Sequence, residues 1–291
     1  MNLPLKNVIL SGRYFPEGVM LYCLNTHKRK GAGMDKLLLF DLDGTLLTTD
    51  KKISPKTFSA VMRARENGYL IGICTSRSEG NSLDFIGRLQ PDVTISSGGA
   101  MVSLRGEVIV TDAFTSGQTH RILSEAKRIC SDISISLDSA SADAEFYSNF
   151  KPPEDALSAS WGKTIYTDFI DFYKPALKIC FEIFDKDKAE ELQDALPFCD
   201  CIKFSDGEWY KFTKSGVTKE TAIKKTCVHL GIDLTQVTAF GDDLADIGML
   251  RMCGTGVAMG NALPEVKAAS DITIGSNDED GIAYYLDSLI G

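Results

Sequence analysis

The chain has 291 residues, of which 44% are apolar, and its formal net charge is −9. A chain of this length and composition can bury a large core, either in one large α/β domain or in two domains of ordinary size. The negative charge argues against a nucleic-acid-binding surface, because such a surface needs clustered Lys and Arg against the phosphates. The eight cysteines are scattered without a CxxC pair, which favours reduced thiols and a cytoplasmic location.

Residues 1–33 do not join the pattern that follows them. They lack the charged, apolar and small-residue order of a signal peptide, and no run in the chain reaches the roughly 20 apolar residues that a membrane span requires. We therefore expect a soluble protein with an N-terminal extension of unknown role. Within this extension, "KNVIL" and "VMLYCL" are compatible with short strands.

From residue 36 onward, short apolar runs alternate with amphipathic helical patterns. Strands are expected over 37–40, 69–74, 92–97, 237–240, 256–259 and 271–274. Helices are expected from Ser54-Pro55, over 79–89 and 218–230, from about 243, from Pro264 and at the C-terminus. Ser54 is the expected N-cap of the first helix, and Gly68 its end. Apolar strands bounded by helices indicate an α/β fold with a Rossmann-like parallel sheet, covered by helices on both faces.

A long insertion over about 115–200 interrupts this pattern and has its own order of elements. Its helices are expected over 118–130 and 187–196, and its strands near 133–138, 144–149, 176–184 and 199–204, with a Pro-rich turn at 151–155. Lys178 and Glu182 interrupt an otherwise apolar strand, which indicates a sheet with helices on one side only. We therefore expect a core domain over 34–114 and 201–291, with a smaller α/β domain over 115–200 inserted into it.

Two carboxylates, Asp41 and Asp43, follow directly on the first core strand in the stretch "FDLDGTLL". Ligands of open parallel sheets bind outside the carboxyl ends of the strands, and residues two apart in an extended chain point to the same side. Two unpaired carboxylates would repel each other there, so a cation or a shared proton is expected. Gly44 permits the chain to turn sharply away. A solvated Asp-x-Asp-Gly turn is the alternative interpretation of this stretch alone.

Further polar groups follow other core strands. Thr75 and Ser76 come after the second strand, where a hydroxyl and nearby amides can hold a phosphate oxygen, and Asp242 and Asp246 follow the strand over 237–240. Each has a local alternative, since a threonine often caps a helix and acidic residues suit the first turn of one. Lys219 stands at the start of a helix, where a positive charge is disfavoured unless an anion binds there.

Together these residues resemble the haloacid dehalogenase-like hydrolase superfamily, and specifically its Cof-type phosphatases. The DxDGT motif lies at 41–45, the threonine of the second motif at 75, the lysine of the third at 219, and the GDxxxD motif at 241–246. The segments "VAMGNA" (257–262) and "NDEDGIA" (277–283) are similar to the closing segment of the family. The resemblance covers about residues 36–290. It implies that the insertion over 115–200 is the α/β cap that selects the substrate.

The resemblance implies a Mg²⁺-dependent phosphatase that hydrolyses small phosphomonoesters, such as sugar phosphates or cofactor- and nucleotide-like phosphates, through an aspartyl phosphate. Asp41 is the implied nucleophile, and Asp43 the implied acid/base. The implied metal ligands are the side chains of Asp41 and Asp242 and the backbone carbonyl of Asp43, with Asp246 near the metal or orienting Lys219. The implied phosphate-binding residues are Thr75, Ser76, Lys219 and Gly44.

Three positions depart from the family pattern. Ala245 and Gly98 each stand where an Asn is usual, and Glu220 replaces a small residue after the lysine. The catalytic acids are all present, so we expect a phosphatase. A phosphomutase of the same superfamily, or a non-catalytic phosphate-ligand binder suggested by Ala245 and Gly98, are the alternatives. The expected partner is a small phosphate ester, with no nucleic acid and no membrane, and the chain is expected to be a monomer or a homodimer.

Overall fold

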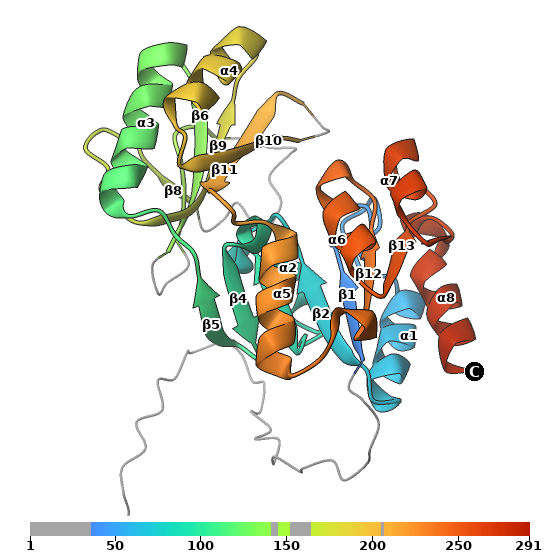
Figure 1. The fold of residues 1–291 in the computed structure, drawn as a ribbon. Helices are drawn as coiled ribbons and strands as arrows, with labels where there is room; N and C mark the ends of the chain where they lie inside the picture. Colours follow the sequence, from blue (N-terminus) through green and yellow to red (C-terminus); the bar gives the residue numbers. More distant parts are fainter. Residues whose placement is uncertain (1–35, 141–144, 152–163, 205–206) are drawn as a thin grey trace, which may run out of the picture. The chain divides into compact units, whose positions relative to one another are not determined.

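The computed structural model describes residues 36–140, 145–151, 164–204 and 207–291. Within these residues eight strands form one sheet, in the order β14-β13-β12-β1-β2-β3-β4-β5 (Figure 1). Its strands are β1 (Leu37–Phe40), β2 (Leu70–Cys74), β3 (Val93–Ser96), β4 (Met101–Leu104), β5 (Glu107–Thr111), β12 (Val237–Gly241), β13 (Thr255–Ala258) and β14 (Ile272–Thr273). The two strands suggested within residues 1–33 lie outside the described residues.

Strand β1 lies at the centre of this sheet. It pairs in parallel with both β2 and β12, and Leu37 aligns with Leu70 on one side and Val237 on the other. All four of its residues are fully buried, which explains their purely apolar sequence. The accompanying helices are α1 (Pro55–Glu66), α2 (Glu79–Ile86), α5 (Lys219–Leu230), α6 (Ile247–Met252), α7 (Pro264–Ala269) and α8 (Gly281–Ile290). The predicted α/β fold with a parallel sheet core is confirmed.

The start of α1 shows how local sequence sets these boundaries. Ser54 Oγ accepts a hydrogen bond from the amide of Thr57 (3.0 Å), and Pro55 occupies the first helical turn, where its missing N–H costs nothing. The predicted N-cap is therefore confirmed. The helix expected from about 243 instead begins as a 3₁₀ turn, Leu244–Asp246, and α6 follows it.

The hairpin of β4 and β5 was not predicted from the sequence. Strand β4 pairs antiparallel with both β3 and β5, so this edge of the sheet departs from the parallel pattern. The turn residues Arg105 and Gly106 both have positive φ, 50° and 84°, the conformation that two-residue hairpins require. The signal was weak because Arg rather than Asn or Asp precedes the glycine.

A second sheet has the order β10-β11-β9-β6-β7-β8. Its strands are β6 (Ser134–Ser139), β7 (Phe146–Ser148), β8 (Thr164–Tyr166), β9 (Ala176–Glu182), β10 (Cys199–Lys203) and β11 (Trp209–Lys214). Two helices, α3 (Ser116–Cys130) and α4 (Lys186–Ala195), pack on it, and their apolar residues share one buried cluster with Ile135, Phe181 and Phe212. Ser136 and Lys211, neighbours of these apolar residues in their strands, point to the other face.

The C-terminal end of the second sheet lies beyond residue 200, where the inserted domain was expected to end. Strand β11 pairs with both β9 and β10, so the sheet runs on to Lys214. The reason is that Phe212 packs into the cluster under α3 and α4. The division of the chain into a core and a cap domain stays a prediction, with this boundary moved.

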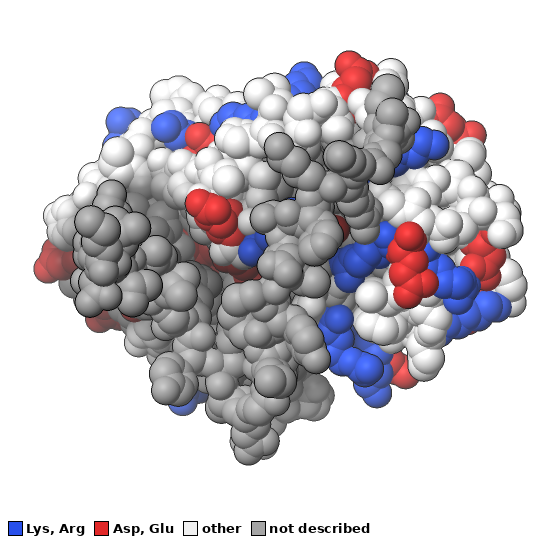
Figure 2. Space-filling model, turned by 90° about the horizontal axis from the view of Figure 1, so that it is seen from below, with Lys and Arg blue, Asp and Glu red and all other residues white. Residues whose placement is uncertain are grey.

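Charged side chains of both signs lie on the surface of the molecule (Figure 2). Figure 2 shows one face of the molecule, on which acidic side chains lie among the basic ones, as is usual for solvated surfaces. In the part of the chain that the structure describes, no helix combines the length and the apolar character needed to cross a membrane.

Candidate active site

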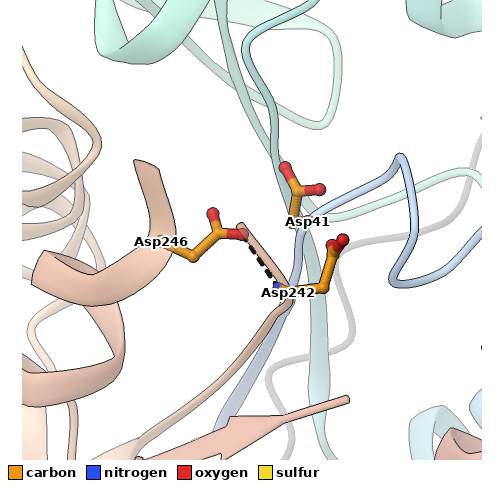
Figure 3. A group of neighbouring side chains, drawn as sticks. All are labelled: Asp41, Asp242 and Asp246. Atoms are coloured by element: carbon orange, nitrogen blue, oxygen red, sulfur yellow. Dashed lines mark hydrogen bonds between the residues drawn. The ribbon is translucent and has the colours of Figure 1, made fainter. Parts of the chain in front are cut away.

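The carboxyl ends of two adjacent strands, β1 and β12, bring three of the predicted acidic residues together. Asp41 follows β1, Asp242 follows β12, and Asp246 lies in the turn after it (Figure 3). The amide of Asp41 donates to the carbonyl of Phe240 (3.0 Å), which extends the parallel pairing of β1 and β12 to the site itself. One carboxylate oxygen from each of the three acids lies within 4.8 Å of the others. Residues about 200 positions apart are thus neighbours because parallel strands end at one edge.

Lys219 lies between two of these carboxylates. Its Nζ donates to Asp41 Oδ1 at 2.7 Å and to Asp246 Oδ1 at 2.6 Å, and its side chain is 4% exposed. Burial disfavours the ammonium, but the carboxylates of Asp246 and Asp41 hold the pKa of Lys219 well above its usual value. Lys219 is therefore a permanent positive charge against Asp41, at the N-terminus of α5 as expected from the sequence.

Asp246 positions the groups around it. Its Oδ1 accepts from Lys219, and its Oδ2 accepts from the amides of Asp242 and Asp243, each at 3.1 Å. Both of its oxygens are therefore engaged within the protein. Of the two roles expected for Asp246, orienting Lys219 fits this geometry better than direct contact with a metal.

Asp242 is held by the loop after β1. Thr45 Oγ1 donates to Asp242 Oδ1 at 2.6 Å. Burial raises the pKa of Asp242 to about 6, even though the Thr45 hydroxyl stabilises the carboxylate. Burial likewise raises the pKa of Asp41, and Lys219 offsets this only in part. Both carboxylates therefore favour a further positive charge nearby.

Asp43 turns away from this cluster. Its carboxylate accepts two hydrogen bonds from Arg77, at 2.6 Å from Nε and 2.8 Å from Nη2, and one from Lys51 at 2.7 Å. Burial alone would raise the pKa of Asp43, but these contacts lower it to about 2. The two side chains therefore do not share one partner: Arg77 and Lys51 contact Asp43, whereas Lys219 contacts Asp41. The chain turns directly after Asp41, so the alternation of an extended strand does not apply.

Arg77 and Lys51 were not assigned a role from the sequence. Arg77 lies two residues after Thr75 on the loop that follows β2, and this was the available signal. The sequence held no signal for Lys51, because its contact with Asp43 depends on the path of the loop after β1.

Thr75 is available for an oxygen ligand. It is buried, and its Oγ1 accepts from the amide of Arg77 at 3.1 Å. In the described part of the chain no acceptor engages its O–H, so the hydroxyl can donate to a ligand. Ser76 offers a half-buried side chain beside it, while its carbonyl accepts from Lys178 Nζ at 2.6 Å.

Two departures from the family pattern have a steric counterpart. A Cβ on Gly98 would lie 2.8 Å from Lys211 Nζ, so Lys211 fills the space of a side chain there. A Cβ on Gly248 would lie 1.4 Å from Glu220 Oε1, so the absence of a side chain at 248 makes room for Glu220. The glycine at 98 is therefore matched by the lysine at 211, and the glutamate at 220 by the glycine at 248.

A model of the haloacid dehalogenase-like hydrolase family matches residues 38–286. The chain belongs to this family. The match spans both sheets and every acidic residue of the site described above.

The proteins to which this chain is similar include named phosphatases. The chain is 31% identical over 249 residues to the HMP-PP phosphatase of Escherichia coli O6:H1, covering 81% of this chain and 88% of the relative. It is 26% identical over 272 residues to the 5-amino-6-(5-phospho-D-ribitylamino)uracil phosphatase YitU of Bacillus subtilis, covering 86% and 96%. The solved HAD subclass IIB sugar phosphatase BT4131 is similar with a TM-score of 0.73 and 26% identity, covering 87% and 98%. The chain is accordingly a phosphoric monoester hydrolase of the Cof type.

Gly44 offers a test of how tightly the site is built. Its φ is +76°, and a Cβ on it would lie 2.2 Å from Asp242 Oδ2. We expect Gly44→Ala to displace Asp242 and lower kcat/KM by about 100-fold or more. The matched control is Gly106→Ala, with φ of +84° and open space around it. The positive φ should cost each variant about 1 kcal/mol in urea unfolding, and the displacement of Asp242 should add to this cost in Gly44→Ala alone. Equal activity in the two variants would contradict the expectation.

Proposed function

We propose that this chain is a Mg²⁺-dependent phosphatase of small phosphomonoesters that works through an aspartyl phosphate on Asp41. One observation carries the proposal: the buried carboxylate of Asp41 contacts Lys219 and lies in one acidic cluster with Asp242, at the carboxyl edge of the parallel sheet. A carboxylate nucleophile needs neighbouring positive charge before it can approach an anionic ester. Lys219 supplies one such charge.

The donor atoms fit a divalent cation. Asp41 Oδ1 and Asp242 Oδ1 are engaged by Lys219 and Thr45, and within the described residues no hydrogen bond engages the Oδ2 atom of either acid. Two carboxylate oxygens and the Asp43 carbonyl suit a hard cation. When bound, Mg²⁺ would neutralise charge on the nucleophile and on the phosphoryl oxygens.

The residues of this chain then divide the reaction between them. Asp41 attacks phosphorus while the bond to the leaving oxygen breaks, and Lys219 and the Thr75 hydroxyl hold the phosphoryl oxygens. Ser76 and the backbone at Gly44 lie beside them as further phosphate contacts. Water then cleaves the aspartyl phosphate and restores Asp41. Asp43 serves both halves, donating a proton to the leaving oxygen and later accepting one from water.

Asp43 must leave its present partners to act as an acid. With a pKa of about 2, it is ionised while Arg77 and Lys51 hold it. An arriving phosphate is dianionic and competes for the guanidinium of Arg77, whose side chain is 23% exposed. Asp43 released in this way regains a higher pKa and turns toward the leaving group. Substrate binding and activation of the acid are thereby coupled.

Substrate choice is assigned to the residues that form the second sheet. The relatives named above are an HMP-PP phosphatase, a 5-amino-6-(5-phospho-D-ribitylamino)uracil phosphatase and a sugar phosphatase. We propose sugar phosphates or cofactor- and nucleotide-like phosphates as substrates here too, selected by the inserted α/β segment. A phosphomutase would return the phosphoryl group to a sugar instead, and release of free phosphate separates the two.

Metal removal tests the proposal. We expect EDTA to abolish phosphate release from an ester panel, by about 1,000-fold or more, and added Mg²⁺ to restore it. The reason is that no side chain in the described ranges donates a hydrogen bond to Oδ2 of Asp41 or of Asp242, which leaves these oxygens to the metal. Asp242→Asn should weaken Mg²⁺ activation, whereas Asp287→Asn, which breaks a surface ion pair with Arg63, should not. Full activity in metal-free buffer would contradict metal dependence. Ligand binding without any turnover would instead favour the non-catalytic binder.

A further inference from the structure

The face of the second sheet that points away from α3 and α4 is polar. Lys211 pairs across the strands with Cys180, which in turn pairs with Ser136, and Lys178 pairs with Asp138. Two contacts join this face to loops of the first sheet: Ser97 Oγ donates to Asp138 Oδ2 at 2.7 Å, and Lys178 Nζ donates to the carbonyl of Ser76 at 2.6 Å. The polar face therefore lies against the loops that follow β2 and β3, beside Thr75.

Lys211 reaches into this junction. Lys211 is only 3% exposed, and its Nζ occupies the space that a side chain at position 98 would take. The amide of Gly98 donates to the carbonyl of Thr75 at 3.0 Å. Gly98 therefore lies beside the Lys211 ammonium and is hydrogen-bonded to Thr75, a proposed phosphate-binding residue.

The neighbouring cations are all paired, and Lys211 is not. Lys178 contacts Asp138 at 3.1 Å, and Lys219 contacts Asp41 and Asp246. Over the described ranges no carboxylate comes within ion-pair distance of Lys211. Burial, followed by the charges of Lys219 and Lys178, lowers the pKa of Lys211 to about 8, so the ammonium is still mostly protonated at neutral pH. A buried unpaired charge is unfavourable, and a bound anion relieves it.

We propose that Lys211 binds a second anionic group on the leaving-group side of the substrate. The substrate class is then a phosphomonoester whose leaving group carries a carboxylate or another phosphate. Lys219, Thr75 and the carboxylate cluster already serve the transferring phosphoryl group. In-line displacement directs the leaving group away from Asp41 and outward from the sheet edge, toward the polar face that bears Lys211. This inference rests on the proposed phosphatase function and narrows its substrates.

Matched ester pairs test the inference. The probes are phosphoglycolate against ethyl phosphate, for a carboxylate, and fructose bisphosphate against fructose monophosphate, for a second phosphate. We expect the native protein to favour the doubly anionic member of at least one pair by about 10- to 100-fold in kcat/KM. Lys211→Met should bring this ratio close to one, mainly through KM, and change ethyl phosphate hydrolysis less than about threefold. Lys211→Arg should retain part of the preference.

Two further readouts separate recognition from folding. Lys214→Met alters an exposed lysine of the same strand and should keep the native preference. Because Lys211→Met removes an unpaired buried charge, its Tm should equal or exceed that of the native protein. An equal loss for both members of a pair, or no native preference, would overturn the inference while leaving the phosphatase function in place. If the native protein hydrolyses no ester at all, the proposed function itself fails, and this inference with it.

Discussion

Replacing Asp41 by Asn is expected to lower turnover of every phosphate ester by at least about 10⁴-fold, because the attacking oxygen is lost and no phosphoenzyme can form. Lys219 and Asp246 keep their contact in this variant, so the fold should survive. Intact-protein mass spectrometry after rapid quenching measures the outcome directly. The native protein should show an added phosphoryl group during turnover, and Asp41→Asn should show none.

Asp43→Asn is the matched variant in the same loop. Its backbone carbonyl is unchanged, so Mg²⁺ binding should be retained, while both halves of the reaction slow by about 10² to 10⁴-fold. The loss should be smallest for an aryl phosphate whose leaving group needs no proton, and the phosphoenzyme should then accumulate. A phosphoryl group that persists in Asp41→Asn, or that maps to another residue, would show that the nucleophile has been assigned to the wrong side chain.

Lys219→Met is expected to affect both stability and activity. It leaves Asp41 and Asp246 buried side by side without their cation, which should cost about 3–5 kcal/mol in urea unfolding measured in EDTA. Turnover should fall by about 10² to 10⁴-fold, because the charge that opposes the phosphoryl oxygens is gone. The site would then depend on the metal alone for positive charge.

A lysine on the same helix gives the control for this prediction. Lys225→Met breaks an exposed ion pair with Asp112 and should cost less than about 1 kcal/mol. Adding Asp246→Asn to Lys219→Met removes one of the two buried charges, so stability should partly recover while activity does not. Equal stability of the two lysine variants, or native activity in Lys219→Met, would contradict the role given to Lys219.

Much of the fold was predictable because the signals are local. The run at 37–40 is apolar at every position, as a strand buried on both faces must be, and Ser54-Pro55 begins a helix by capping and dihedral preference. Local patterns failed where the outcome depended on a distant partner. Residues 209–214 were expected in the core with the rest of 201–291, and no strand was predicted there. Only the pairing of β11 with β9 and β10 places these residues in the second sheet.

The residues of the site were also predictable, but the ion pairs and hydrogen bonds between them were not. Asp41, Asp242 and Asp246 were expected together because strands of a parallel sheet bring their carboxyl ends to one edge whatever their separation along the chain. Lys219 was expected because a lysine at the start of a helix indicates an anion there. The tertiary structure alone decided that Lys219 bridges two acids, that Arg77 holds Asp43, and that Lys211 lies unpaired beside Gly98. The physical reason is that charge pairing and burial depend on distances of a few ångströms between side chains of different elements, and no spacing along a sequence encodes these distances.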